Sequence, residues 1–242
     1  MKLILDIGNT RVKAAVFEND TLLEVFVFEK TALLVTLQEI KKTYLIDAGI
    51  LASVADVSSE MLREVLQFFP FLVLSSKTQV PFVNSYATPD TLGVDRLALI
   101  AAAVATYPQE NVLVIDAGSC VTFDVVTKEA EYLGGAISPG LQMRYKALHQ
   151  FTGKLPLLSV SDPEKIVGTT TEESMHTGVV RGLSHEIEGA IQEYQSKYSE
   201  LTIVLTGGDA NFLGNQLKSV IFAHPNFVLE GLHTILTYNL NK

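Results

Sequence analysis

The sequence predicts an α/β protein built from two similar halves, each with a mixed β-sheet flanked by helices. A strand–turn–strand pattern with an acidic turn at residues 6–10, DIGNT, returns as DAGSC at residues 116–120. Short apolar runs also alternate with stretches of helical periodicity along the whole chain. The 242 residues suffice for two compact domains, each with a core of its own. We therefore expect one domain over residues 1–111 and a second over residues 112–242.

The first hairpin starts almost at the first residue. Residues 3–5 form an apolar run typical of a buried strand, the run ends at Asp6, and a second strand follows from Val12. This arrangement suits a metal-bound polyphosphate, because Gly8 lets backbone N–H groups approach phosphate oxygens and Lys13 adds positive charge. An ordinary β-hairpin with a polar turn explains the stretch equally well. The repeat of the pattern favours the phosphate site.

The rest of the first half alternates strands and helices. Periodicity and N-cap residues predict a strand at 21–28, a helix at 32–43, a strand at 48–54, a helix at 60–69 and a strand at 71–74. The expected order is therefore β-β-β-α-β-α-β.

A second candidate site follows the longest irregular stretch, residues 75–94, which contains Tyr86. The next residues, to about 107, are rich in Ala and Leu and predict a helix whose first turn holds Asp95 and Arg96. An aspartate there complements the helix dipole, whereas an arginine opposes it. With Gly93 directly ahead, the pair is better explained as a functional site than as helix capping.

The second half opens with the repeated hairpin and ends in helices. We expect a third strand at 131–137, helices at 141–151 and 172–198, a strand at 201–205, a helix at 210–217, a strand at 226–229 and a helix at 231–240. The turn GGAISPG at 134–140 could bind an anion at the following helix start or be purely structural. The two glycines of TGGD at 206–209 permit close approach of adenine or ribose, and they equally permit an ordinary turn between a strand and a helix. The threonines at 169–171 fit an N-cap region.

Composition limits the classes of function. A net charge of −9 and a pI of about 5.0 argue against nucleic acid as the main partner. Cys120, the single cysteine, excludes an intrachain disulfide, and the five histidines share no metal-ligand spacing. No leader pattern precedes the first strand, and no apolar run reaches about 18 residues, so we expect a cytoplasmic protein outside the membrane.

The two acidic hairpins resemble those of the actin, Hsp70 and sugar-kinase superfamily, whose halves share a ribonuclease-H-like core and clamp a nucleotide in the cleft between them. More narrowly, the ordered set of motifs resembles the type III pantothenate kinase family. The matching motifs are DIGNTRVK at 6–13, Tyr86, GVDR at 93–96, DAGS at 116–119, GGAISPG at 134–140, Thr171 and TGGD at 206–209. They extend over nearly the whole chain, and the small size also fits this family.

The resemblance implies ATP-dependent phosphorylation of pantothenate to 4′-phosphopantothenate, the first step of coenzyme A biosynthesis. It assigns ATP binding to Asp6, Ile7, Gly8, Asn9, Thr10, Arg11, Val12, Lys13 and Ser119. It assigns pantothenate binding to Tyr86, Gly93, Val94, Asp95, Arg96 and Thr171, with Asp95 as the catalytic base. Asp6 would hold Mg²⁺ with the nucleotide, and Asp116 would hold a monovalent cation, K⁺ or NH₄⁺. Two positions depart from the family pattern, since threonine is more usual at Ser119 and asparagine at Thr170.

The resemblance also implies a homodimer whose pantothenate pocket is shared between subunits. The helix after Thr171 carries a stripe of apolar residues spaced by four, namely Met175, Val179, Leu183, Ile187 and Ile191. Pattern alone favours packing of this stripe on the protein's own sheet, whereas the resemblance favours packing on a partner. Two other functions fit the same fold: a non-enzymatic nucleotide-binding transcriptional regulator, and a different small-molecule kinase or polyphosphate hydrolase.

Overall fold

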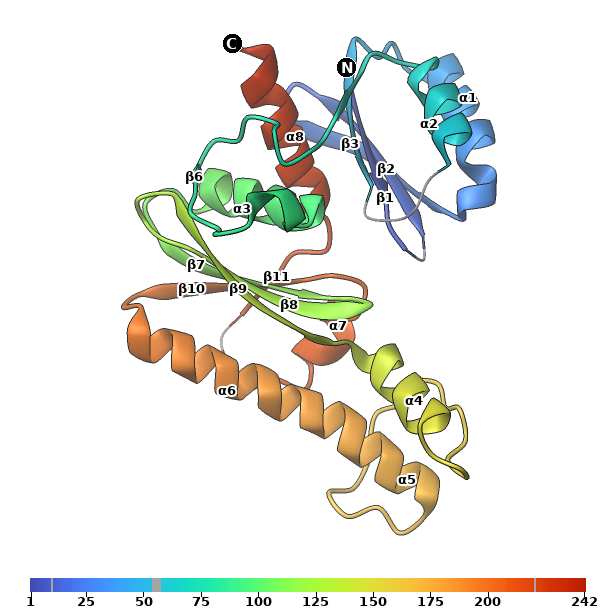
Figure 1. Ribbon diagram of the computed structural model, residues 1–242, viewed down its shortest axis with the longest axis vertical. Helices are drawn as coiled ribbons and strands as arrows, with labels where there is room; N and C mark the ends of the chain where they lie inside the picture. Colours follow the sequence, from blue (N-terminus) through green and yellow to red (C-terminus); the bar gives the residue numbers. More distant parts are fainter. Residues whose placement is uncertain (10, 54–57, 220) are drawn as a thin grey trace. The chain divides into compact units, whose positions relative to one another are not determined.

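The computed structural model describes residues 1–9, 11–53, 58–219 and 221–242, which form two compact units (Figure 1). Unit 1 comprises Met1–Pro108, Ala130–Tyr132 and Asn226–Lys242, and unit 2 comprises Gln109–Glu129 and Leu133–Pro225. Both units are α/β, as the sequence predicts. The division at residue 111 stays a prediction, since the contacts group two later segments with unit 1. No helix within the described residues combines the length and the apolar character needed to cross a membrane.

Unit 1 is built on a five-stranded sheet of order β3-β2-β1-β4-β5. The strands are β1 (Lys2–Ile7), β2 (Val12–Glu18), β3 (Thr21–Phe28), β4 (Ala48–Ser53) and β5 (Phe71–Val73). β1 pairs antiparallel with β2 and parallel with β4, which gives the expected mixed sheet. The helices are α1 (Leu33–Thr43), α2 (Ser59–Leu66), α3 (Val94–Thr106) and α8 (Phe227–Leu240), with short 3₁₀ turns at Lys30–Ala32 and Pro89–Thr91. The predicted order β-β-β-α-β-α-β is confirmed.

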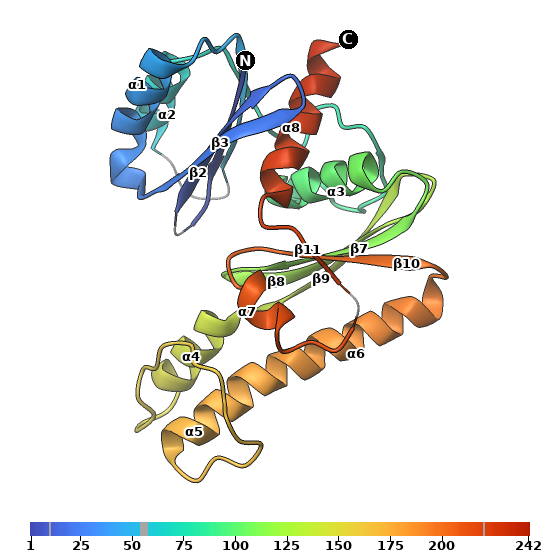
Figure 2. The same cartoon turned by 180° about the vertical axis from the view of Figure 1, so that it is seen from behind.

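Helices cover both faces of this sheet, with α1 and α2 on one side and α8 on the other (Figure 2). Leu3 and Leu5 of β1 pack toward α1 and α2, while Ile4 between them packs toward α3 and α8. A strand buried on both faces reads as a continuous apolar run, which explains why residues 3–5 lack alternation. Each fully buried Leu or Ile contributes roughly 1.5–3 kcal/mol relative to an exposed one.

The predicted strand at 226–229 is wrong, because these residues form the start of α8. A run as short as Phe227-Val228-Leu229 fits a strand and a buried helix equally well. The predicted helix starts at Gly231, yet this glycine lies inside α8. There it allows close helix packing, because a Cβ on Gly231 would lie 1.8 Å from the carbonyl oxygen of Ala98 in α3.

Unit 2 repeats the strand arrangement of unit 1. Its strands are β7 (Asn111–Ala117), β8 (Cys120–Val126), β9 (Glu131–Pro139), β10 (Leu201–Thr206) and β11 (Phe222–Ala223), and the second sheet has the order β11-β10-β7-β8-β9-β6. β7 pairs antiparallel with β8 and parallel with β10, as β1 does with β2 and β4. β6 (Val83–Asn84) pairs with the first two residues of β9, which belong to unit 1.

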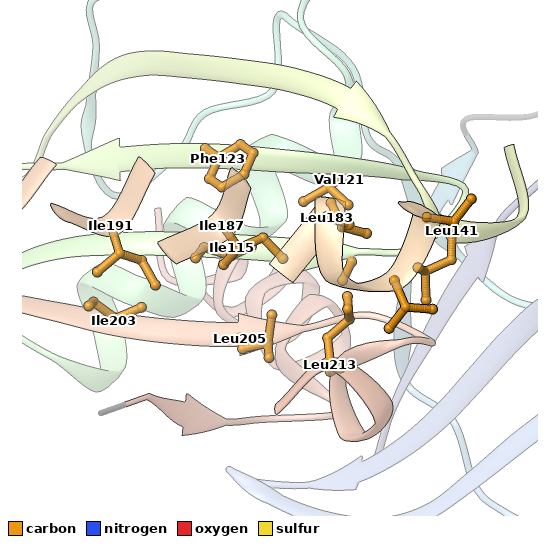
Figure 3. Packing of buried hydrophobic residues seen from close by; sticks show 14 of the residues in the cluster. Ile115, Val121, Phe123, Leu141, Leu183, Ile187, Ile191, Ile203, Leu205 and Leu213 are labelled. Atoms are coloured by element: carbon orange, nitrogen blue, oxygen red, sulfur yellow. The ribbon is translucent and has the colours of Figure 1, made fainter. Parts of the chain in front are cut away.

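The helices of unit 2 are α4 (Leu141–Gln150), α5 (Thr171–His176), α6 (Gly182–Lys197) and α7 (Ala210–Gly214). A π-helical segment, Thr177–Arg181, joins α5 to α6. The apolar stripe on this helical run is buried against the unit's own sheet (Figure 3). The expectation that the stripe packs on a partner is therefore wrong.

The π segment explains how residues spaced by four stay on one face. In an α-helix with 3.6 residues per turn, each step of four residues drifts by about 40°. The wider π turn, with its i→i+5 hydrogen bonds, offsets part of that drift. The offset acts on the steps from Met175 through Val179 to Leu183, which cross this segment. In α6 itself, Leu183, Ile187 and Ile191 face Ile115, Ile203 and Leu205 of the sheet.

Candidate active site

The hairpin between β1 and β2 places Asp6 at a strand end beside Lys13, its cross-strand partner. The turn closes tightly, with the Gly8 amide donating to the Arg11 carbonyl over 3.1 Å. A Cβ on Gly8 would lie 2.9 Å from that carbonyl oxygen, so the turn requires glycine. Thr10 lies outside the described residues.

The remaining hairpin residues differ in what they can offer a ligand. Ile7 and Val12 point into the core and are buried, so only their backbone groups are available. Asn9 and Arg11 are exposed and can contact a ligand through their side chains. The sequence pattern alone does not make this distinction.

The carboxyl group of Asp6 is held in an environment that disfavours its charge. Removal from water, the largest cause, raises the pKa of this carboxyl, Lys13 lowers it, and the negative charge of Asp95 raises it further, so that the pKa is about 6 in total. Asp95 therefore lies near enough for the two carboxyls to interact, although the two residues are far apart in the sequence. A buried carboxylate with a second carboxylate nearby fits a divalent cation, which would relieve the repulsion.

No three His, Cys, Asp or Glu side chains gather to hold a metal by themselves in the part of the chain that the structure describes. This agrees with the way Mg²⁺ binds in nucleotide sites. It takes one or two protein carboxylates and fills its remaining positions with phosphate oxygens and water.

The start of α3 arranges the second candidate pair. Gly93 is the N-cap residue, and a Cβ there would lie 2.4 Å from Oδ1 of Asp95. That oxygen accepts a hydrogen bond from the Arg96 amide over 2.8 Å. Val94, the first residue of the helix, packs against the core of unit 1. Glycine at 93 therefore leaves room for the Asp95 carboxylate at the helix start.

Arg96 is nearly buried, with 5% of its surface exposed. Its guanidinium lies over the ring of Tyr86, 5.4 Å from the centroid. A cation held against an aromatic face keeps part of its stabilisation when it leaves water. The structure therefore brings together two of the predicted substrate-binding residues, Tyr86 from the loop and Arg96 from the first turn of α3.

Sequence reasoning missed Tyr132, which completes this cluster. Its ring is fully buried and stacks on Tyr86, with centroids 6.1 Å apart and planes inclined by 13°. The available signal was its position, directly ahead of the Gly-rich motif. The pattern gave it only a place in the predicted strand at 131–137.

In unit 2 the repeated turn lies against the Gly-rich motif. Gly118 donates to the Cys120 carbonyl over 2.8 Å, and Gly140 donates to the Ser119 carbonyl over 3.2 Å. A Cβ on Gly140 would lie 2.1 Å from the Gly118 carbonyl oxygen. Ser119 is exposed at this turn, and α4 begins one residue after Gly140.

The third Gly-rich motif lies against the same turn. Gly207 has a φ of +97°, and a Cβ there would lie 2.4 Å from Oδ1 of Asp116. Asp209 donates its amide to the Ala117 carbonyl over 2.9 Å, and burial raises the pKa of its carboxyl. Three motifs that are weak separately therefore meet at one turn, and Gly207 lies against the carboxylate of Asp116 where that turn begins. A carboxylate among close-packed backbone is a suitable ligand for a cation.

Thr171 begins α5, and a capping network holds the loop before it. Thr170 is the N-cap residue, and its Oγ1 accepts from the Glu173 amide over 3.2 Å. The Glu173 carboxylate accepts from both the amide and the hydroxyl of Thr169, over 2.7 and 2.6 Å. Asparagine also caps helices well, which accounts for threonine at a position where the family often has asparagine.

The Thr169 amide offers a direct test of this network. The hydrogen bonds from Thr169, together with nearby Lys165, lower the pKa of Glu173 to about 2 from an ordinary 4.5. A depressed carboxyl pKa means that the network stabilises the protein above pH 4.5 and is lost as the pH falls toward about 2. We expect the Thr169 amide proton to titrate by NMR with a midpoint well below 4.5. Glu173→Gln should abolish this titration.

Glu172→Gln is the matched control, because Glu172 is adjacent and takes no part in these hydrogen bonds. It should leave the Thr169 titration unchanged. A midpoint near 4.5 in the parent protein would contradict the network.

A groove of about 1080 Å³ opens beside Thr171, between α4 and α5. Leu148, Phe151 and Met175 line it together with the threonine run at 169–171. Phe151 is 80% exposed, an unusual position for a large apolar side chain. Thr171 belongs to unit 2, whereas Asp95 belongs to unit 1.

Comparison with known proteins gives a consistent result. Residues 2–193 match the family model described as type III pantothenate kinase. A type III pantothenate kinase of Christiangramia forsetii is 47% identical over 240 residues, which cover 99% of both chains. Among solved structures, a Baf family protein from Campylobacter jejuni has a TM-score of 0.66 at 24% identity, covering 99% of this chain and 100% of that one. A glucokinase from Streptomyces griseus has a TM-score of 0.54 at 10% identity, covering 98% and 99%. The two structures support the fold alone and confirm the predicted fold class.

Proposed function

The chain belongs to the type III pantothenate kinase family, and we propose how its residues carry out the phosphorylation of pantothenate by ATP. Phosphoryl transfer needs in-line positioning, neutralisation of phosphate charge and a group that receives the hydroxyl proton. One observation carries the assignment. Asp95 stands in the first turn of α3 beside buried Arg96, and its charge is felt by Asp6 at the hairpin. The residues for all three requirements therefore lie in unit 1.

Asp95 is the proposed catalytic base. Its carboxylate would orient the primary hydroxyl of pantothenate and accept the proton as the oxygen attacks the γ-phosphorus. Arg96 would pair with the pantothenate carboxylate, since a guanidinium can form two parallel hydrogen bonds to it. Because Arg96 is already nearly buried in the free protein, little further desolvation is needed on binding. Tyr86, Gly93 and Val94 would line the same pocket.

The hairpin is the proposed ATP site. Gly8 and its neighbours would offer backbone N–H groups to the phosphates, Asn9 and Arg11 their side chains, and Lys13 its charge. Asp6 is the proposed Mg²⁺ ligand, and the ion would neutralise phosphate charge during transfer. Ser119 in unit 2 would add a hydroxyl to the nucleotide site.

Asp116 is the proposed ligand of a monovalent cation, K⁺ or NH₄⁺. Oδ1 of Asp116 and the carbonyl oxygen of Ala117 both lie close to Gly207, so a carboxylate and a carbonyl oxygen face the same position. The chain as a whole carries a net charge of −9, so an added cation near the phosphates would supply charge that the protein lacks. We place the protein in the cytoplasm, where pantothenate and ATP are available.

We further propose a homodimer in which Thr171 of one subunit completes the pantothenate pocket of the other. The exposed apolar side chain of Phe151, which lines the α4–α5 groove, supports this, because a partner would bury it. Ile166 and Val167 are also exposed and precede Gly168 in the sequence, which lines the groove. The stripe on α6 gives no support, since it packs on its own sheet.

Mixed dimers test the shared pocket. Chains carrying Asp95→Asn and chains carrying Thr171→Arg should each be nearly inactive as homodimers. In a mixed dimer one pocket contains both changes and the other contains neither. Random exchange should therefore restore about one quarter of the parent activity, because half of the dimers are mixed and half of their pockets are intact.

The activity should be measured after the two variants are unfolded and refolded together, with each variant refolded alone as the control. Activity of the mixture no greater than the mean of the two separate samples would contradict a pocket shared between subunits.

A further inference from the structure

The loop that carries Tyr86 is tied to a segment far along the chain, residues 130–132. The Val83 amide donates to the Ala130 carbonyl over 2.9 Å, and the Ser85 amide donates to the Tyr132 carbonyl over 3.0 Å. These bonds flank the β6–β9 pairing of Asn84 with Tyr132. Backbone bonds of this kind fix the path of the loop but leave the orientation of the Tyr86 ring open.

Side chains then fix the ring. Tyr132 is fully buried, and its ring stacks nearly parallel on Tyr86. Phe82 meets Tyr132 edge-on, with centroids 6.2 Å apart and planes inclined by 78°. Arg96 lies over Tyr86 at 5.4 Å. The four side chains form an aromatic ladder, Phe82–Tyr132–Tyr86–Arg96, that runs from partly buried Phe82 to Arg96 in the proposed pantothenate pocket.

The ladder restricts what each member can do. Packing holds the rings of Phe82 and Tyr132 in place. The Tyr86 ring can therefore stack on Tyr132 only when it lies nearly parallel to the Tyr132 ring. The cation–π contact in turn favours one position of the Arg96 guanidinium, because the attraction requires the cation over the ring face. A bidentate arginine–carboxylate pair tolerates little misplacement of the guanidinium.

We propose that Tyr132 is a positioning residue for the acceptor pocket, acting through the Tyr86 ring to hold the Arg96 guanidinium where the pantothenate carboxylate binds. The proposal rests on the proposed function, which assigns that carboxylate to Arg96. Tyr132 itself has no contact with substrate in this account. Its effect should therefore be on the KM for pantothenate, with the turnover at saturation left nearly unchanged.

The test compares Tyr132→Phe, which keeps the ring, with Tyr132→Met, which removes it at similar volume. Tyr132→Met should raise the KM for pantothenate about tenfold, as expected for loss of one stacking contact and one dependent cation–π contact. Tyr132→Phe should stay within about twofold of the parent. The KM for ATP and the kcat should stay within about twofold in both variants, since the hairpin and Asp95 are untouched.

Glu131→Gln is the matched control from the same segment. Glu131 accepts a hydrogen bond from the Ser85 hydroxyl over 2.5 Å but is not part of the ladder. It should leave the KM for pantothenate unchanged. If Tyr132→Met does not fold, Tyr132→His replaces it in the test, because histidine keeps a smaller flat ring. The KM of Tyr132→His for pantothenate should lie between that of the parent and that of Tyr86→Leu.

A double-variant cycle distinguishes an effect of Tyr132 that acts through Tyr86 from a general loss of packing. In a Tyr86→Leu background, Tyr132→Met should add little to the KM, because the link between Tyr132 and Arg96 is already broken. Fully additive effects, or equal losses of kcat and of affinity for both substrates, would overturn the proposal. If Arg96→Lys leaves the KM for pantothenate unchanged, the assignment of the carboxylate to Arg96 fails. If Arg96→Lys raises the KM and Tyr132→Met does not, the positioning role alone fails.

Discussion

Asp95→Asn should fold and bind both substrates but transfer phosphate about 10²–10⁴-fold more slowly than the parent, the usual contribution of general-base catalysis. Asparagine keeps the size of the side chain and an oxygen that can accept the Arg96 amide hydrogen bond, so the start of α3 should stay intact. The carboxamide cannot accept the hydroxyl proton. Rapid-quench single-turnover measurement of phosphopantothenate isolates this step from binding and product release.

Asp90→Asn is the matched control for this prediction. Asp90 lies in the same loop, in the 3₁₀ turn Pro89–Thr91, and accepts a hydrogen bond from the Ser76 hydroxyl over 3.1 Å. Its removal should change the rate by no more than about twofold, as expected for a surface position. An Asp95→Asn rate within a few-fold of the parent would show that Asp95 is not the base.

Gly231→Ala should produce the largest loss of stability, about 3 kcal/mol or more, since overpacking of a close contact costs at least 1–3 kcal/mol. The added Cβ would lie 1.8 Å from the Ala98 carbonyl oxygen, a backbone atom that cannot rotate away. The helices α8 and α3 would have to separate. Because α3 also carries Asp95 and Arg96, activity should fall with stability. Urea denaturation at several enzyme concentrations measures the free energy of unfolding.

Gly189→Ala provides a control with the opposite expected sign. Gly189 lies in the interior of α6, is exposed, and a Cβ there meets no atom within 4 Å. Alanine should raise the free energy of unfolding by about 0.5–1 kcal/mol, because glycine loses more backbone entropy on folding. Equal effects of the two substitutions would contradict the close packing of α8 on α3.

The sequence was most informative where a local pattern determines a local structure. The repeat of an acidic hairpin correctly indicated the shared arrangement of β1, β2 and β4 with β7, β8 and β10. The unfavourable placement of Arg96 in a first helical turn drew attention to a residue that is indeed nearly buried beside Tyr86. Both signals depend on neighbours within a few residues.

The sequence was least informative where distant segments determine the structure. Nothing around Gly231 shows that Ala98 will lie against it, so the glycine looked like a helix start. Tyr132 received no role from the sequence, because its relation to Tyr86 depends on the pairing of β6 with β9. The apolar stripe was ambiguous for a similar reason, because spacing by four predicts a shared face but not the surface against which that face packs.

The most direct test of the central claim is to measure ADP release by the purified protein. A coupled assay with ATP and Mg²⁺ should monitor this release in the presence and in the absence of pantothenate. We expect ADP release to depend on pantothenate and to match the formation of phosphopantothenate one for one. A nucleotide-binding regulator would release no pantothenate-dependent ADP, and a polyphosphate hydrolase would release the same amount without pantothenate. Either of these results would contradict the assignment of pantothenate kinase activity to this chain.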